Sequence, residues 1–406
     1  MTPIDDASRR GAGAMSAVKG ASLEMADLKG DMSKMQIGLG AALSQAAGEA
    51  HAETSAAGSL ARRRRRFAVM AVLGAISLTF LAGVSSLRPR PPRSDEYASD
   101  WPLRDEIVAA TARAGDALLT VAVARSEVVM DGGVPFVVLL GDAARKKAAA
   151  DAAPDDPFSR DALRSHPELL VRETVFGDYA LVLNKFPALP HHALLITKNF
   201  SPQAWRLTKR DLGALHRSAA AADALGFYNS DAVAGASQPH RHFQLVFNDA
   251  FADVLGDGAL AAPPIQAAVD ALGSEHFLWS TKAPFVPHIR RLDALAGIAH
   301  GLVQLPRRAT FSVDFATDGD FDDALLRAYA HLLRDLDLFE QPPYNLLLSK
   351  SWLLVVKRRS RDGAGVDVNA LGYAGCLLAR DESSFARVAA APRAALAAAA
   401  VPSTGY

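Results

Sequence analysis

Two histidines and a glutamine at alternating positions are the residues best suited to chemistry in this sequence. They are His240, His242 and Gln244, within the run His-Arg-His-Phe-Gln. The apolar residues that follow predict a strand over 240–247, and alternate side chains of a strand share one face. A neutral imidazole nitrogen can attack phosphorus without first losing a proton, and such an attack splits one difficult transfer into two easier steps. The pattern therefore indicates phosphorus chemistry on histidine.

A loop of small and polar residues, 229–239, precedes this strand. Gly235, Ala236 and Ser237 let the backbone approach an anion closely, as in phosphate-binding nests. Histidines two positions apart also occur in metal sites. However, the single cysteine, Cys376, is distant in sequence, and no further His or acidic ligand flanks the pair. We therefore predict a phosphate site and no metal site.

The run from His240 to Gln244 resembles the His-x-His-x-Gln signature of the nucleotidylyltransferase branch of the histidine-triad superfamily. Four further segments, in the same order along the chain, resemble the diadenosine tetraphosphate phosphorylase or ATP adenylyltransferase family. These segments are Met130–Leu140, Leu183–Pro187, Tyr344–Val356 and Val368–Gly375. The resemblance covers about Asp116–Arg380. It implies an α+β fold with a histidine-triad-like antiparallel sheet and flanking helices.

The resemblance also assigns roles to individual residues. It implies that His242 is the nucleophile, that His240 orients it or the phosphate, and that Gln244 holds a non-bridging oxygen. Taken alone, the lysines of this family pattern read as exposed surface residues. The substrate-binding residues that it implies are Lys146, Asn184, Lys185, Asn229, Gly235, Ala236, Ser237, Gln238, Ser349 and Lys350.

The implied activity is phosphorolysis of diadenosine tetraphosphate to ATP and ADP through an adenylyl-histidine intermediate. The expected partners are the dinucleoside polyphosphate, ATP, ADP and phosphate, with no cofactor beyond Mg²⁺ carried by the nucleotide. A hexose-1-phosphate type of nucleotidylyltransferase stays open, although such enzymes usually carry extra metal-ligating Cys and His. A dinucleoside polyphosphate hydrolase also stays open, although that branch typically has His in place of Gln244. A membrane-tethered protein that only binds nucleotides would not need the nucleophile.

Composition sets limits on partners and on domain number. Lys+Arg and Asp+Glu balance at 44 each, so no basic excess indicates nucleic acid. The 406 residues allow two or three domains, and one cysteine excludes an intrachain disulfide. We expect a monomeric catalytic histidine-triad-like domain over 99–260, a C-terminal adenylyltransferase domain over 261–391 and a tail over 392–406.

The first 98 residues differ in character from the rest. Residues 1–66 are poor in aromatic side chains and predict a disordered tail. Phe67–Leu87 carries no charge and has the length of about 20 residues that a membrane-spanning helix needs. Residues 88–98 then form a linker. We therefore predict a single-pass membrane protein with its catalytic domain in the cytosol or an organelle matrix. The alternative is an organelle-targeted soluble protein whose leader is removed.

Hydrophobic periodicity predicts the elements that position the motif. One Ala-rich helix runs directly into the motif, and Leu225–Tyr228 is expected to end it with a break at Gly226. Helices are predicted over 105–122, 208–225, 263–273 and 322–336. Strands are predicted over 134–140, 169–175, 179–184, 192–197, 240–247, 344–349 and 352–356.

Overall fold

The computed structural model describes residues 101–141, 156–255, 262–273, 287–305, 318–340 and 343–403. The chain divides into two units, Met1–Pro91 and Pro92–Tyr406, and every described residue belongs to the second. Residues 1–66 and the linker at 88–98 thus lie outside the described ranges, as does Phe67–Leu87.

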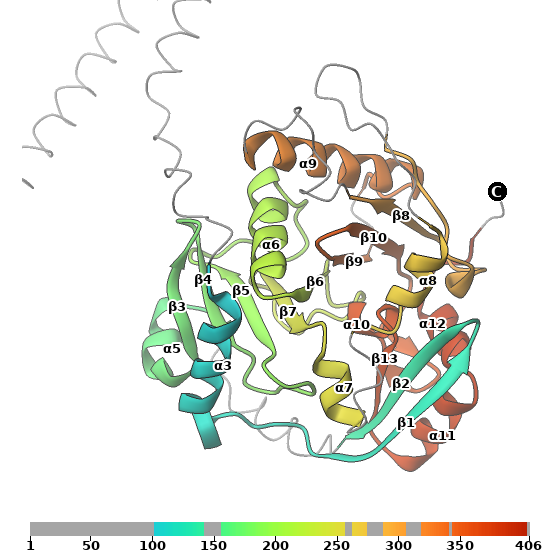
Figure 1. Ribbon diagram of the computed structural model, residues 1–406, viewed down its shortest axis with the longest axis horizontal. Helices are drawn as coiled ribbons and strands as arrows, with labels where there is room; N and C mark the ends of the chain where they lie inside the picture. The colour runs from blue at the N-terminus through green and yellow to red at the C-terminus, as the bar shows by residue number, and fades with distance from the viewer. Residues whose placement is uncertain are drawn as a thin grey trace, which may run out of the picture. The chain divides into compact units, whose positions relative to one another are not determined.

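An eight-stranded sheet organises the second unit (Figure 1). Its strand order is β3-β4-β5-β7-β6-β9-β10-β8, and every neighbouring pair is antiparallel. The His-x-His-x-Gln motif therefore lies near the middle of the sheet, with its last three residues on β7. The strands are β3 (Leu170–Val175), β4 (Tyr179–Leu183), β5 (Ala193–Thr197), β6 (Ala224–Asn229), β7 (His242–Phe247), β8 (His300–Gln304), β9 (Tyr344–Leu348) and β10 (Trp352–Lys357).

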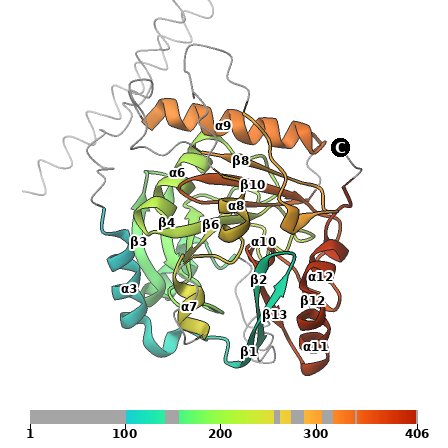
Figure 2. The same ribbon diagram turned by 45° about the vertical axis from the view of Figure 1, so that its right-hand side comes forward.

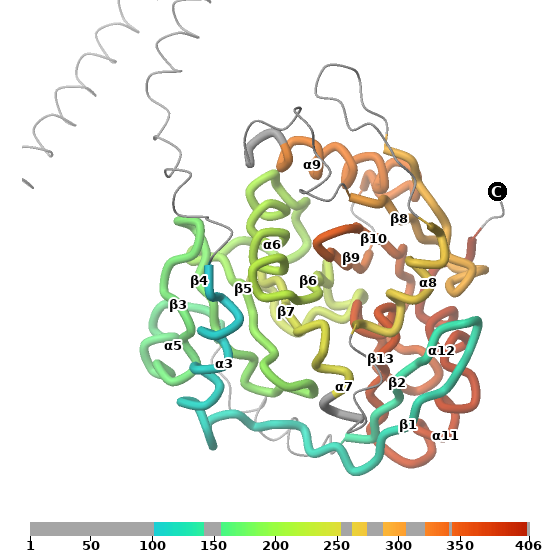
Figure 3. Tube along the Cα trace, in the orientation of Figure 1, coloured from blue at the N-terminus to red at the C-terminus, as the bar shows by residue number. Residues whose placement is uncertain are grey.

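A smaller sheet joins the beginning of this unit to its end. β1 (Val123–Asp131) and β2 (Val134–Gly141) form a hairpin, and β13 (Cys376–Ala379) pairs in parallel with β2. The trace in Figure 3 shows this hairpin beside the C-terminal helices. The short strands β11 (Asp362–Gly363) and β12 (Val366–Asp367) pair with each other. The parallel pairing needs no tight turn, because about 240 residues of chain separate its two strands.

Helices cover the large sheet (Figure 2). α6 packs on the central strands β6, β7 and β9, and α9 packs on α6, on β10 and on the edge strand β8. A capping box between Thr208 and Asp211 begins α6, which satisfies backbone donors at its first turn. The α-helices are α3 (Leu103–Ala114), α5 (Arg160–Ser165), α6 (Lys209–Ala221), α7 (Ala250–Leu255), α8 (Gln266–Ala271), α9 (Asp318–Asp335), α10 (Ala370–Tyr373), α11 (Glu382–Ala390) and α12 (Pro392–Ala399). Single 3₁₀ turns are η2 (Gly115–Ala117), η3 (Pro167–Leu169) and η4 (Asp293–Leu295).

One prediction is wrong next to the motif, because the helical run does not continue to Tyr228. α6 ends at Ala221, and Ala224–Asn229 forms the buried strand β6 between β7 and β9. Gly226 allows α6 to pack closely on this strand, since an added Cβ would lie 2.8 Å from Cδ1 of Leu215. Pairing with two neighbouring strands outweighs the local helix propensity of an Ala-rich segment.

The remaining predicted elements are confirmed in type, with differences at both ends of the unit. The helix expected over 105–122 is shorter, because α3 ends at Ala114 and Gly115 has a φ of +47°. Residues 392–406 were expected to be a tail, whereas Pro392–Ala399 forms α12 and buries Leu396 completely.

The predicted fold included a membrane-spanning helix, and this part of the prediction is wrong. Among the residues that the structure describes, no helix combines the length and the apolar character that crossing a bilayer requires. The longest, α9, carries several Asp and Arg side chains in its 18 residues. The fold is mixed α and β with a large antiparallel sheet. The predicted localisation as a single-pass membrane protein is not supported.

Candidate active site

His242 is the first residue of β7 and only 3% of its surface is exposed. Its ring packs against Phe158, with 5.3 Å between the ring centroids. Its Nδ1 lies 2.8 Å from the backbone carbonyl oxygen of His240, which can only accept a hydrogen bond. Nδ1 therefore carries the proton of the neutral ring, and Nε2 keeps a lone pair that can attack an electrophile.

Burial also keeps this ring neutral. Desolvation lowers the pKa of His242 to about 4, although the hydrogen bond to the His240 backbone opposes the shift and the charge of His240 adds to it. The ring is therefore unprotonated over the whole physiological pH range. A neutral imidazole is the form that acts as a nucleophile.

This depressed pKa predicts a loss of stability in acid. Above pH 6.5 the ring is neutral both in the folded and in the unfolded chain. Between about pH 6.5 and about pH 4 only the unfolded chain binds the proton, so the free energy of unfolding falls by about 1.4 kcal/mol per pH unit from this group. We expect His242→Asn to reduce the slope of stability against pH by that amount, measured by urea unfolding between about pH 6 and pH 5. An unchanged slope would contradict the buried, neutral ring.

His240 is buried and held by oxygen atoms at both ring nitrogens. Its Nδ1 lies 2.9 Å from Oδ2 of Asp156, and its Nε2 lies 2.8 Å from the backbone oxygen of Thr197. This arrangement fixes the position of the His240 carbonyl, which in turn orients the ring of His242. Sequence reasoning missed Asp156, because it lies 84 residues before its partner in an ordinary polar loop.

Gln244 follows on the same face of β7 and is half-buried. Its Oε1 lies 3.0 Å from Nε2 of His192, the residue that directly precedes β5. The two cross-strand neighbours agree with this placement, since Ile196 pairs with His242 and Leu194 pairs with Gln244. His192 was not predicted, because a His-His pair before a strand carries no distinguishing sequence signal.

The side chain between the two histidines points to the other face, as strand alternation requires. The Nη1 of Arg241 donates to Oδ2 of Asp211 at 2.9 Å, and both side chains are about 4% exposed. Tyr179 donates to the other oxygen of Asp211. This buried ion pair anchors the start of β7 to α6. Removing one partner of such a pair is strongly destabilising, because it leaves the other charge buried without compensation.

Gln203 ties the beginning of β7 to the end of β6, and it too was missed from the sequence. Its Oε1 accepts a hydrogen bond from the backbone N–H of His242 at 2.9 Å. Its Nε2 donates to the backbone oxygen of Asn229 at 2.7 Å. Since the side chain is 3% exposed, these bonds hold the backbone of His242 at a defined distance from the loop that follows β6.

The predicted phosphate-binding loop curls over the end of β6. Gly235 has a φ of +98°, and a Cβ there would lie 2.7 Å from the Cβ of Asn369. The amides of Ala234 and Ala236 bond back to Asp231. Within the described ranges the backbone N–H groups of Ser237 and Gln238 make no hydrogen bond. These two donors are suited to binding an anion.

Asn229 supports this loop from below. It is 1% exposed, and its Oδ1 accepts hydrogen bonds from Nδ2 of Asn345 and from the backbone N–H of Ala370, both at 2.8 Å. Arg358 is equally buried, bonds to the side chain of Asn345 and donates to the loop oxygen of Ala234. The Asn229 side chain therefore points into the protein and not toward His242.

Among the residues that the structure describes, no contact joins a predicted lysine to His242. Lys146 lies outside the described residues. Lys185 is half-buried in the connection between β4 and β5, where its backbone oxygen accepts from Leu119. The Nζ of Lys350 donates to Asp223, just before β6 begins. His242 lies beside the other end of β6, and the six residues of that strand span roughly 20 Å. Ser349 caps the turn beside Lys350 through bonds to the amides of Ser351 and Trp352.

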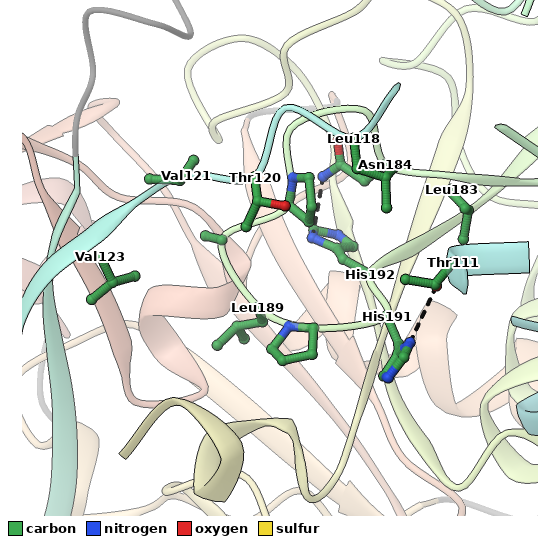
Figure 4. Close-up of a pocket in the computed structure, with 13 residues that line it drawn as sticks. Thr111, Leu118, Thr120, Val121, Val123, Leu183, Asn184, Leu189, His191 and His192 are labelled. Carbon is green, nitrogen blue, oxygen red and sulfur yellow. Dashed lines mark hydrogen bonds between the residues drawn. The ribbon is translucent and has the colours of Figure 1, made fainter. Parts of the chain in front are cut away.

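A cavity of about 370 Å³ opens beside the β4–β5 connection (Figure 4). Most of its lining is apolar, and its polar groups are Thr111, Thr120, Asn184, His191 and His192. The Nδ1 of His191 lies 3.1 Å from Oγ1 of Thr111, and Asn184 lies 3.1 Å from His192. His192 also contacts Gln244, so one residue of the cavity lining is hydrogen-bonded to the strand that begins with His242.

Comparisons with known proteins show which family the chain resembles. A family model for the Ap4A phosphorylase N-terminal domain matches residues 98–257, and one for the ATP adenylyltransferase C-terminal domain matches residues 283–402. Diadenosine 5',5'''-P1,P4-tetraphosphate phosphorylase 2 of Saccharomyces cerevisiae is 29% identical over 281 residues, which is 62% of this chain and 76% of that protein. The crystal structure of yeast Ap4A phosphorylase Apa2 in complex with Ap4A has a TM-score of 0.56 and 26% identity, and the match covers 75% of this chain and 98% of that one. The Apa2 complex with AMP gives the same values.

Proposed function

The chain belongs to the family of Ap4A phosphorylases and ATP adenylyltransferases, and from this we propose that it is a nucleotidyltransferase that phosphorolyses diadenosine tetraphosphate to ATP and ADP. The observation that carries the proposal is the buried, neutral ring of His242, whose Nε2 is left with its lone pair. A nucleophilic route needs a ring in this form, and a protein that merely binds nucleotides does not.

In the first step, Nε2 of His242 attacks the α-phosphorus of the dinucleotide. A nitrogen–phosphorus bond forms, the bond from that phosphorus to the bridging oxygen breaks, and ATP leaves with the electron pair. The adenylyl group then remains on His242. A polyphosphate is a good leaving group, so stabilisation of charge on the phosphoryl oxygens is the larger task.

Hydrogen-bond donors around His242 stabilise the negative charge on the phosphoryl oxygens in this mechanism. The side-chain amide of Gln244 and the backbone N–H groups of Ser237 and Gln238 are suited to the non-bridging oxygens. Lys185 follows Asn184 in the connection between β4 and β5 and stays a predicted phosphate ligand, as does Lys146. Mg²⁺ carried by the nucleotide and a monomeric catalytic domain also stay predictions.

In the second step, an oxygen of inorganic phosphate attacks the adenylyl phosphorus. The bond to His242 breaks, its Nε2 regains the lone pair, and ADP is released. The cavity beside Asn184 and His192 is the proposed site of the adenosine moiety, because its volume of about 370 Å³ lies within the usual range for ligand pockets, about 300–1,000 Å³.

The test of the proposed function is the fate of labelled phosphate. We expect the full chain to convert diadenosine tetraphosphate into equal amounts of ATP and ADP, with ¹⁸O from labelled phosphate only in the β-phosphoryl group of ADP. The same enzyme without phosphate should form far less product, because water has to replace the acceptor. Accumulation of AMP in excess phosphate would instead assign a dinucleoside polyphosphate hydrolase. Turnover of a nucleoside diphosphate hexose in place of the dinucleotide would assign the hexose-1-phosphate type.

A further inference from the structure

A chain of three hydrogen bonds runs from the β4–β5 connection into Gln244. The backbone N–H of Phe186 donates to Oδ1 of Asn184 at 3.0 Å. The Nδ2 of Asn184 lies 3.1 Å from Nδ1 of His192, and Nε2 of His192 lies 3.0 Å from Oε1 of Gln244. Figure 4 shows the middle bond of the chain, at the rim of the cavity.

The first bond sets the direction of the other two. A backbone N–H can only donate, so Oδ1 of Asn184 must accept and its Nδ2 must donate to His192. Nδ1 of His192 then accepts, which leaves the single proton of the neutral ring on Nε2. That proton is donated to Oε1 of Gln244. The amino group of Gln244 is therefore turned away from His192.

The starting point of this chain is rigid. The backbone N–H of Asn184 bonds to the backbone oxygen of His192 at 2.8 Å, which places the two side chains next to each other. The oxygens of Lys185 and Pro187 accept from Leu119 and Val121, so the connection is also held from outside. The His192 side chain is 8% exposed and its ring lies against Phe227, with 5.9 Å between centroids.

We propose that Asn184 and His192 are positioning residues that hold the Gln244 side chain with its amino group, and not its carbonyl oxygen, toward the phosphoryl group. This inference rests on the proposed function, because it concerns the oxygen atoms of the group transferred to His242. The two ends of a glutamine amide have nearly the same shape, so packing alone does not choose between them. A reversed amide would place an acceptor against an anion.

The decisive variant is Asn184→Asp, which keeps the size of the side chain and replaces its donor nitrogen by an acceptor oxygen. The new carboxylate accepts from Phe186 and also requires a proton on Nδ1 of His192. In neutral His192 the Nε2 then becomes an acceptor, and Gln244 must turn its carbonyl oxygen toward the phosphoryl group. At low pH a second proton on His192 restores the donor at Nε2 and with it the original amide.

We therefore expect the kcat of Asn184→Asp to fall on the order of 10²-fold near pH 9, the usual cost of losing one transition-state donor, and to recover most of that loss near pH 6. The KM for diadenosine tetraphosphate should change much less. His191 and Lys185 are titratable residues on the same connection as His192, and His242 lies on the same strand as Gln244. The segments facing His192 across the cavity present Thr111 and Thr120, which carry no charge.

Asn199→Asp is the control for charge, because it adds a carboxylate at an exposed position outside the chain of bonds. Its rate relative to the wild type should be the same at both pH values. If Asn184→Asp loses the same factor at both pH values, or changes only KM, Asn184 acts in folding or substrate binding alone and the proposal is overturned.

A second measurement does not depend on activity or on the folding of Asn184→Asp. Selective ¹⁵N labelling of the 11 histidines of the wild-type chain, with His192→Gln to assign the signal, reports which ring nitrogen carries the proton. We expect the Nε2–H tautomer for His192. A proton on Nδ1 alone would overturn the proposal. The Nε2–H tautomer in a chain that does not act on diadenosine tetraphosphate would support the hydrogen-bond direction and refute the proposed function instead.

Discussion

His242→Ala is expected to abolish adenylyl transfer, with a loss of kcat on the order of 10⁶, the scale measured when a nucleophile is removed from a protease. The ring supplies the atom that forms the covalent bond, and among the described residues no other side chain presents a buried, neutral nucleophilic nitrogen at the same place. Binding of the dinucleotide should persist, because the cavity and the loop amides lie on other segments.

The readout is a trapped intermediate. Diadenosine tetraphosphate labelled in its α-phosphoryl group should leave acid-labile label on the wild-type protein when phosphate is omitted, and none on His242→Ala. Equal labelling of both proteins would mean that another residue is the nucleophile.

His300 offers a matched control for this variant. Its Nδ1 also donates to the carbonyl two residues earlier, that of Ile298, at 2.8 Å, and burial likewise lowers its pKa to about 4. Its Nε2, however, accepts the backbone N–H of Leu292 at 2.7 Å, so its lone pair is already used. His300→Ala should therefore lower the melting temperature while labelling at saturating substrate is retained by the folded fraction. Loss of labelling in a folded His300→Ala protein would show that the effect of His242→Ala is not specific to the site.

Gln244→Glu is expected to lower kcat by about 10²- to 10³-fold, the usual cost of removing one donor to a developing anion. The substitution preserves shape, and His192 can still donate to one carboxylate oxygen. The other oxygen then faces the phosphoryl group as a negative charge. Single-turnover rates of adenylyl transfer, measured at saturating dinucleotide, test this expectation.

Gln304→Glu is the control for adding one negative charge. Gln304 lies on the edge strand β8, where its amide donates to the backbone oxygen of Gly273. Its substitution should change the rate less than about threefold, as expected for a charge whose effect is screened by solvent and salt. If both variants lose activity equally, the loss at Gln244 reflects net charge and not its place beside the phosphoryl group.

The tertiary structure corrected the sequence interpretation where long-range pairing competes with local preference. The Ala-rich run before the motif predicted helix through Tyr228, but β7 and β9 recruit Ala224–Asn229 as a central strand. Ser349 and Lys350 follow a strand that resembles the family pattern, yet antiparallel pairing carries them to the opposite end of β6 from His242. Neighbourhood in a sheet depends on strand register, which local sequence does not encode.

What the sequence by itself determined is the local chemistry of the motif. Alternation in a strand placed His242 and Gln244 on one face and Arg241 on the other, and small residues before the strand predicted the loop with free amides. These features follow from bond geometry within a few residues, so no partner segment is needed to infer them.

Only the tertiary structure decided which groups orient that chemistry. Asp156 reaches His240 from 84 residues away, Gln203 reaches His242 from 39, and His192 reaches Gln244 from 52. Each is a common polar residue in a segment without a distinctive pattern, so the sequence gives no reason to select it. The protonated nitrogen of each ring and the direction of each amide depend on these distant partners, because a hydrogen bond has a donor and an acceptor and folding alone brings the two together.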